Sequence, residues 1–243
     1  MKKIFISWSM SIKKLPPKIE KTLDLLIEKK YKVLVWDAIW IDELIQDFFC
    51  KKNYFYVFIY SISDPRVFKT EKFKNIKVKI NENIKDLRER QSQKDIFMTD
   101  QSDVSLVIWD WKSKWSYNNI IRLIEKNKEI QIFYNDNFIN KENLNINYIN
   151  KIYDENHKYS LSEYIKEEKS KIKNVKEMKE ILINNLIISK DEVINEKYQK
   201  DVDFKMNRWK KIFVYSKKLL DKLFYTNNVK NNYIHNESNL TLF

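Results

Sequence analysis

Three groups of short polar side chains could bind phosphate or sugar hydroxyls, and each group follows a run of apolar residues. The groups lie in residues 7–11, 37–42 and 110–119. Serine hydroxyls suit hydrogen bonds to phosphate or ribose, and aspartates suit ribose hydroxyls or an amino group. The side chains concerned are Ser7, Ser9, Ser11, Ser113, Ser116, Asp37 and Asp42. Each could instead be an ordinary loop residue or helix cap, Ser116 in particular, because serine is a favoured N-cap.

Residues 104–119, VSLVIWDWKSKWSYNN, join an apolar run to an amphipathic segment through a short polar loop. This pattern predicts a strand, a tight turn and a helix N-terminus, a geometry that offers free backbone N–H groups to a phosphate. Glycine normally allows such a loop to approach a phosphate closely. Here the loop carries Trp111 and Trp115 instead.

The elements that must position these groups alternate between strands and helices. Apolar runs predict strands at residues 4–6, 33–35, 54–60, 104–109 and 130–134, with a short additional strand at 76–80. Amphipathic patterns predict helices after Pro17 and at residues 41–52, 83–98 and 117–126. This alternation indicates an α/β fold, doubly wound and mostly parallel, with right-handed crossovers. Ligands bind beyond the carboxyl ends of the strands in such sheets, so we expect the three polar groups to meet there.

The chain changes character after about residue 135. We expect residues 1–135 to form the α/β domain and residues 136–243 to form a mostly helical, Lys/Asn-rich extension of unknown role. Helical patterns occur at residues 161–188 and 204–224, and residues 227–243 read as a loose tail.

Composition narrows the functional classes. A total of 46 basic and 34 acidic residues gives a net charge of +12, which suits nucleic acid or anionic nucleotides. The lysines are dispersed, however, as the lysine bias of an AT-rich genome would also produce. Cys50 is the only cysteine, and His157 and His235 are far apart. We therefore expect no disulfide, no metal site and no Ser-His-Asp triad.

The N-terminal apolar run is too short for a signal peptide, and no apolar stretch reaches the ~18 residues of a membrane span. The sequence thus predicts a cytoplasmic protein with no membrane contact. One feature of the composition is abnormal. The chain has no glycine, whereas average usage of about 7% would give roughly 17 in this length.

Five ordered segments carry a resemblance to a known family. They read ISWSMSIKKLP, VLVWDAIWID, SISDPR, RQSQKDIFM and IWDWKSKWSYNN. They resemble the Rossmann-like nucleotide-binding proteins of the SLOG superfamily, which includes the DNA-processing protein A type and the LOG phosphoribohydrolases. The resemblance is greatest to bacterial single-domain members, and it covers about residues 1–135.

In the family pattern, glycine stands at the positions of Trp8, Trp36, Trp40, Trp111 and Trp115, whereas Trp109 matches a tryptophan. One interpretation is that these codons are TGA, which some bacterial lineages read as glycine and others as tryptophan. The rival interpretation is a degenerated relative that no longer binds. TGA at the five positions with TGG at Trp109 would support recoding, and TGG throughout would exclude it. An indole at Trp8, Trp111 or Trp115 would occupy the volume of the phosphate, so the chain as written should bind nucleotide poorly.

The resemblance implies a module that binds or senses a nucleotide or a nucleotide-derived ligand. Loops 7–11, 36–42 and 110–119 would hold the phosphate, with Arg66 as a further contact or a solvated surface charge. Lys94 and Asp95 could form a structural pair nearby, and Met10 replaces an arginine of the pattern. The implied binding residues are Ser7, Trp8, Ser9, Ser11, Asp37, Trp40, Asp42, Arg66, Asp110, Trp111, Ser113, Trp115, Ser116, Asn118 and Asn119.

Two other functions stay open. LOG-type enzymes place a glutamate after their glycine-rich loop, but this chain has Tyr117, Asn118 and Asn119 there. No catalytic residue is therefore identified, and binding without turnover is favoured over cleavage of a nucleotide N-glycosidic bond. The alternative of a DNA-binding protein rests on the basic composition, although the aromatic–basic interleaving of strand-binding grooves is not evident. The sequence predicts no cofactor, and a homo-oligomer is compatible with it.

Overall fold

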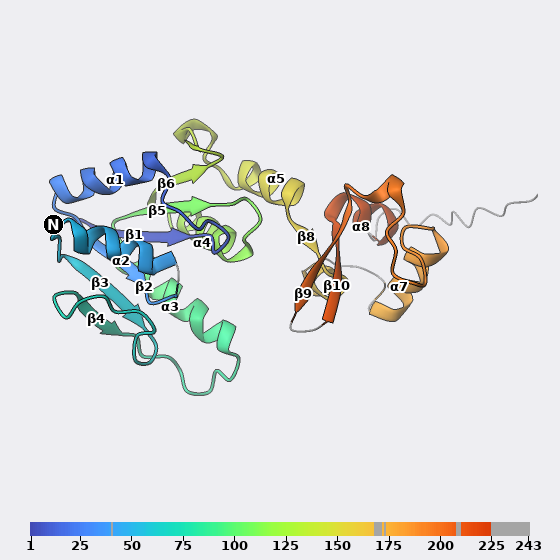
Figure 1. The fold of residues 1–243 in the computed structure, drawn as a ribbon, viewed down its shortest axis with the longest axis horizontal. Helices are drawn as coiled ribbons and strands as arrows, with labels where there is room; N and C mark the ends of the chain where they lie inside the picture. The colour runs from blue at the N-terminus through green and yellow to red at the C-terminus, as the bar shows by residue number, and fades with distance from the viewer. Residues whose placement is uncertain (40, 168–171, 173, 208–209, 225–243) are drawn as a thin grey trace, which may run out of the picture. The chain divides into compact units, whose positions relative to one another are not determined.

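The computed structural model describes residues 1–39, 41–167, 172, 174–207 and 210–224 (Figure 1). Contacts divide the chain into two units, Met1–Tyr153 and Asp154–Phe243, called unit 1 and unit 2 below. The boundary lies after Tyr153 rather than at the predicted residue 135, because a β-hairpin and most of a further helix belong to unit 1. No helix among the described residues is both long and apolar enough to cross a membrane.

Unit 1 is built on a seven-stranded sheet with the order β4-β3-β2-β1-β5-β6-β7. All neighbouring strands pair in parallel except β6 and β7, which form an antiparallel hairpin. The prediction of a doubly wound, mostly parallel α/β fold of Rossmann type is confirmed. The strands are β1 (Lys3–Trp8), β2 (Lys32–Trp36), β3 (Val57–Ser61), β4 (Lys74–Lys77), β5 (Val104–Trp109), β6 (Glu129–Tyr134) and β7 (Asn137–Phe138).

Helices cover both faces of this sheet. They are α1 (Pro17–Glu28), α2 (Ile41–Lys51), α3 (Leu87–Gln101) and α4 (Lys114–Glu125); a 3-10 turn at Lys141–Asn143 and α5 (Ile146–Asn156) follow the last strand. Helix α1 begins at Pro17, where a missing N–H costs nothing, and buries Ile19, Leu23 and Leu26 in the core shared with α2. Met98 of α3 packs in a second cluster with Phe5 of β1. Because Phe5 alternates with Ile4 and Ile6 of the first cluster, the two clusters occupy opposite faces of the sheet.

The order in which successive strands join the sheet reverses at its centre. Strands β2, β3 and β4 extend from β1 towards one edge, and β5, β6 and β7 extend towards the other. Strand β1 pairs with both halves, since Phe5 lies beside Leu34 of β2 and Ser105 of β5. The crossover connections therefore leave β1 and β5 on opposite faces, and the loops after these two strands flank the switch.

Residues other than glycine occupy the backbone positions that usually need it. Lys30, Asn53 and Asn127 follow α1, α2 and α4 with φ of 54°, 52° and 50°. Each lies where a helix commonly ends in a left-handed residue. Asn135 and Asp136 form the two-residue turn between β6 and β7, with φ of 47° and 58°. Asparagine and aspartate tolerate this conformation better than other side chains, which explains how a chain without glycine still makes most of its turns.

Unit 2 is a mixed α/β unit and not the predicted run of helices. It contains β8 (Lys158–Tyr159), α6 (Leu161–Glu167), α7 (Val175–Asn184), a 3-10 turn at Glu196–Tyr198, β9 (Val202–Asn207), β10 (Lys210–Ser216) and α8 (Lys217–Phe224). The three strands form an antiparallel sheet in the order β8-β10-β9.

Two predictions made for this unit are therefore wrong in part. The segment 161–188 contains two separate helices, and most of 204–224 is the β9–β10 hairpin, with only α8 helical. The spacing of the apolar residues in 204–224 predicts a helix. They instead pair across strands, as Phe204 does with Phe213, because the sheet of unit 2 decides the conformation. Residues 227–243 lie outside the described part of the chain.

Candidate functional site

The loops after β1 and β5 meet at the carboxyl edge of the sheet through a small buried hydroxyl network. The Ser9 backbone N–H donates to the Ile108 carbonyl at 2.9 Å, which attaches the first loop to β5. Ser9 Oγ lies 2.9 Å from Ser116 Oγ and accepts the Asp110 backbone N–H at 3.1 Å. Ser9 and Ser116 are both fully buried. The structure thus brings together the serines of two loops that are about a hundred residues apart in the chain.

Asp110 organises the loop that leads into α4. Its Oδ1 accepts the backbone N–H groups of Lys112 at 3.1 Å and Ser113 at 2.7 Å, and the Ser11 hydroxyl donates to its Oδ2. Ser113 is the N-cap of α4 and accepts the Ser116 N–H at 3.4 Å. The capping role therefore belongs to Ser113, whereas the alternative reading of the sequence gave it to Ser116.

The two asparagines of α4 differ in their positions. Asn119 is buried and donates from Nδ2 to Ser7 Oγ at 3.0 Å, while its Oδ1 accepts from Arg122 at 2.6 Å. Asn118 is exposed. Asn119 therefore joins the end of β1 to α4, and Asn118 does not take part in that connection.

Asp37, directly after β2, is the centre of an ion cluster. Its Oδ1 accepts from Lys94 Nζ of α3 at 2.7 Å and from Arg66 Nη2 at 3.1 Å, and its Oδ2 accepts from Arg66 Nε at 3.1 Å. The Arg66 backbone N–H also donates to Oδ2, at 3.2 Å. Burial raises the pKa of Asp37, but the bonds from Arg66 and the charge of Lys94 outweigh it and hold that pKa at about 2. Asp37 is thus an ionised anchor for two cations.

Lys94 pairs with Asp37. The sequence predicts a pair between Lys94 and its neighbour Asp95 instead, and that prediction is wrong. Consecutive residues of a helix point in different directions, so a pair at i and i+1 is not formed on α3. The Lys94 side chain is only 1% exposed, and its ammonium lies 5.6 Å from the centre of the Trp36 ring. The α3 segment looked charged and poor in core residues, and this hid the fact that one of its lysines is buried.

Asp42, in the first turn of α2, is a buried carboxyl of a different kind. Its Oδ2 accepts the Ala38 backbone N–H at 2.9 Å. Burial raises the pKa of Asp42 to about 7, although the Ala38 bond and the charge of Lys94 oppose the rise. The residue therefore carries a proton part of the time at neutral pH, a property that its sequence position did not reveal.

The buried Asp95 and the half-buried Arg122 are titratable groups that the predicted binding set does not include. Asp95 is 2% exposed, and burial raises its pKa well above the usual value against the opposing charges of Arg122 and Lys94. Burial likewise lowers the pKa of Arg122. The Trp115 indole is close enough to act on Asp95, but its N–H is outside hydrogen-bonding geometry. Between α3 and α4, the structure therefore holds charged groups that local sequence patterns do not disclose.

The tryptophans at the predicted glycine positions differ in how well they fit. Trp111 has a φ of 56°, a left-handed backbone that a bulky residue rarely adopts. Trp36 and Trp115 meet edge to face at 5.8 Å, and the Nε1 atom of each is buried without a hydrogen-bond partner among the described residues. Buried indole N–H groups usually find a partner.

Two other tryptophans are well accommodated. Trp109 Nε1 donates to the Ser113 carbonyl at 3.3 Å, and the buried Trp8 Nε1 donates to the Ile12 carbonyl at 3.2 Å. Trp109 is the one that matches a tryptophan of the family pattern, whereas Trp8 fits well even though the pattern has glycine there. Trp40, also a predicted glycine position, lies outside the described residues. Three of the five positions thus show signs of a misfitted indole.

Glycine at position 111 should relieve backbone strain. We expect Trp111→Gly to be more stable than Trp111→Ala by about 1 kcal/mol, because both lose the ring contact with Tyr134 but only alanine keeps the Cβ that disfavours a left-handed backbone. The free energy of unfolding, measured with urea, tests this. Position 115 is the control: it is helical, so glycine there should be less stable than alanine, by up to about 1 kcal/mol. The same order at both positions would contradict the interpretation.

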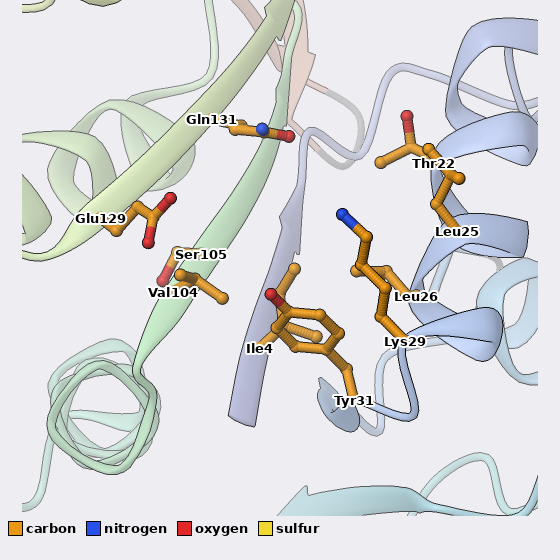
Figure 2. A pocket seen from close by; sticks show the side chains of 10 residues that line it. All are labelled: Ile4, Thr22, Leu25, Leu26, Lys29, Tyr31, Val104, Ser105, Glu129 and Gln131. Carbon is orange, nitrogen blue, oxygen red and sulfur yellow. The ribbon is translucent and has the colours of Figure 1, made fainter. Parts of the chain in front are cut away.

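Two pockets of the described chain lie away from this edge. One of about 120 Å³ is at the opposite, amino-terminal ends of the strands, between α1 and the beginnings of β1, β5 and β6 (Figure 2). Its lining includes Ile4, Lys29, Tyr31 and Glu129. Another, of about 160 Å³, lies between α3 and the segment after β4. At the carboxyl edge, the Trp36 and Trp115 rings are in contact instead.

The described residues contain no group of three or more His, Cys, Asp or Glu side chains that could hold a metal ion. Comparison of the chain with family models, curated proteins and solved structures finds no match. The topology of unit 1 and the side chains at its carboxyl edge are therefore the features that bear on function.

Proposed function

We propose that unit 1 binds a phosphate-bearing ligand, a nucleotide or a nucleotide-derived signal, beyond the carboxyl ends of β1, β2 and β5. One observation carries the proposal. The loops at residues 7–11 and 110–119 flank the switch point between β1 and β5, where open α/β sheets bind their ligands. The loop after β2 lies next to them because β2 pairs with β1.

The side chains at this edge suit an anion. Arg66 is paired with Asp37 but keeps 45% of its side chain exposed, so its guanidinium can also meet a phosphate. The first turn of α4 adds the positive end of a helix dipole. Most hydroxyls and carboxylates of the three loops hold the loops in place. We therefore assign the phosphate to backbone N–H groups and Arg66, and assign the serines and aspartates to positioning.

The tryptophans should weaken this binding in the chain as written. The Trp36 and Trp115 rings lie against each other at the convergence of the loops, and Trp111 is in the turn before α4. Glycine at these positions would remove the rings and let the backbone approach a phosphate.

A thermal-shift panel of nucleotides tests the proposal. The variant carries glycine at all five positions, Trp8, Trp36, Trp40, Trp111 and Trp115, and is compared with the chain as written. We expect the variant to gain a shift of several degrees with at least one nucleotide at saturating concentration, while the parent gains little. Trp109→Gly is the control and should gain none, because Trp109 is a well-bonded core residue. A panel without any response in the five-glycine variant, shown to be folded by circular dichroism, would refute the proposal.

A rival enzymatic function has one observation in its favour. Asp42, with a pKa of about 7, is in the range of a general acid or base. Its carboxyl is buried and bonded to the Ala38 N–H, however, and Asp37 is held by two cations. Binding without turnover is thus the better-supported proposal. Chromatography of the nucleotide after incubation with the protein distinguishes binding from cleavage, because free base would appear only if the protein cleaves the N-glycosidic bond.

A further inference from the structure

Unit 2 places two consecutive helices before a β-hairpin in one small antiparallel sheet. The order along the chain is β8, α6, α7, β9 and β10, and β10 lies between β8 and β9. The strand before the helices thus pairs with the second strand of the hairpin. We propose that unit 2 binds double-stranded DNA through the β9–β10 hairpin. A two-stranded β-ribbon is an established way of docking on a duplex.

One face of the hairpin carries exposed apolar groups around a lysine. Phe204 is paired with Phe213 and Met206 with Lys211, so these four side chains share a face. Lys211 Nζ lies 4.6 Å from the centre of the Phe204 ring and 4.8 Å from that of Phe213. Phe204 is 48% exposed and Met206 60%. This face therefore presents Phe204, Met206 and Lys211 to solvent beside the buried Phe213.

The charge of the hairpin complements a polyanion. Its described residues, 202–207 and 210–216, include three lysines, Lys205, Lys210 and Lys211, and a single acidic residue, Asp203. All four are exposed. Lys205 has one acidic neighbour from another element, Glu163 of α6, at 3.8 Å. The Lys205 side chain keeps 53% of its surface exposed, which leaves its ammonium accessible to a phosphate.

Helix α7 packs against α6 and adds little charge. Met178 and Leu182 are its buried positions, and Asn174 caps its first turn. Its charges cancel, because the two lysines Lys176 and Lys179 are matched by the two glutamates Glu177 and Glu180. The attraction to phosphates thus comes from the hairpin. This proposal concerns unit 2 alone and does not depend on the ligand of unit 1.

Fluorescence anisotropy with the full-length protein and a labelled duplex of about 20 base pairs tests the proposal. We expect binding that weakens with salt, because each phosphate contact releases counterions. In the triple variant Lys205→Ala/Lys210→Ala/Lys211→Ala, affinity at low salt should fall at least ~10-fold, and the slope of log affinity against log salt should become shallower by about 3. The triple arginine variant keeps the charges and should keep the affinity.

The matched control removes the same charge from the same unit. Lys190, Lys200 and Lys218 are exposed lysines outside the hairpin, and changing all three to alanine should reduce affinity less than ~3-fold. Equal losses in the two alanine triples would overturn the proposal, since binding would then follow net charge alone. It would also be overturned if the parent does not bind the duplex, or binds a single strand of the same sequence more tightly. Circular dichroism of each variant shows that a loss of binding is not a loss of fold.

Discussion

Replacing Lys94 with methionine should lower the free energy of unfolding by about 3–5 kcal/mol, the cost of leaving a buried charge without its partner. Lys94 is 1% exposed and lies 2.7 Å from Asp37, whose side chain is 5% exposed. Arg66 still neutralises part of the charge on Asp37, which favours the lower end of that range. Urea denaturation followed by circular dichroism measures the change.

An exposed pair of nearly the same geometry provides the control. Lys52 Nζ lies 2.8 Å from Asp24, with side chains 48% and 41% exposed. Lys52→Met should cost less than about 1 kcal/mol, because water screens both charges and solvates the partner that is left. If Lys52→Met were as damaging as Lys94→Met, burial would not be the source of the effect.

Asp37→Asn/Lys94→Met provides a second measurement. The double variant should lose less stability than the sum of its two single variants, because the second change removes a charge that the first has already left unpaired. Additive losses would show that the two groups do not act as a pair in the folded protein.

Replacing Asp42 with asparagine should stabilise the protein at high pH and change its pH dependence. The pKa of Asp42 is about 7 in the folded protein against a usual 3.8, because burial disfavours the charged form. Between these values the folded state keeps a proton that the unfolded state has lost. The free energy of unfolding therefore falls as the pH rises from 3.8 to about 7 and is flat above it.

The raised pKa of Asp42 sets the expected size of this change in the free energy of unfolding. About three pKa units correspond to about 4 kcal/mol once the carboxylate is fully ionised. The asparagine oxygen can still accept the Ala38 N–H, but its amide group needs a partner of its own, so we expect a gain of about 2 kcal/mol at about pH 8.5 and little gain at about pH 5.

The difference in free energy of unfolding between the parent and Asp42→Asn at each pH isolates the contribution of Asp42. Asp37 has a lowered pKa, so its contribution to stability is lost only as the pH falls towards about 2, and it is constant across this window. Asp95, whose pKa is raised, titrates in both proteins and cancels in the difference. An equal effect of Asp42→Asn at the two pH values would show that the carboxyl is not protonated in the folded state.

The sequence alone determined the α/β fold of unit 1 and the loops at the carboxyl edge of its sheet. Residues 104–109 were predicted as a strand and form one with the same bounds, because a continuous apolar run between turns is a local signal. The convergence of residues 7–11 and 110–119 also followed from the sequence, since parallel strands align their carboxyl ends. These features depend on periodicity and chain direction, and both can be read from residues close together in the chain.

Only the tertiary structure decided which charges are buried and which partners they have. Lys94 meets Asp37 across 57 residues of chain, and no local pattern distinguishes this lysine from its solvated neighbours. The raised pKa of Asp42 has the same origin, because desolvation depends on everything that packs around the carboxyl.

Unit 2 shows the same limit at the level of secondary structure. Apolar residues whose spacing fits a helix form strands here, because β10 pairs with β8 and β9. For the tryptophans, the sequence showed an anomaly of position. The structure shows what this anomaly means physically: Trp111 has a left-handed backbone, and the buried N–H groups of Trp36 and Trp115 have no partner among the described residues. Backbone conformation and hydrogen-bond satisfaction depend on the surroundings of a residue, which only the folded chain defines.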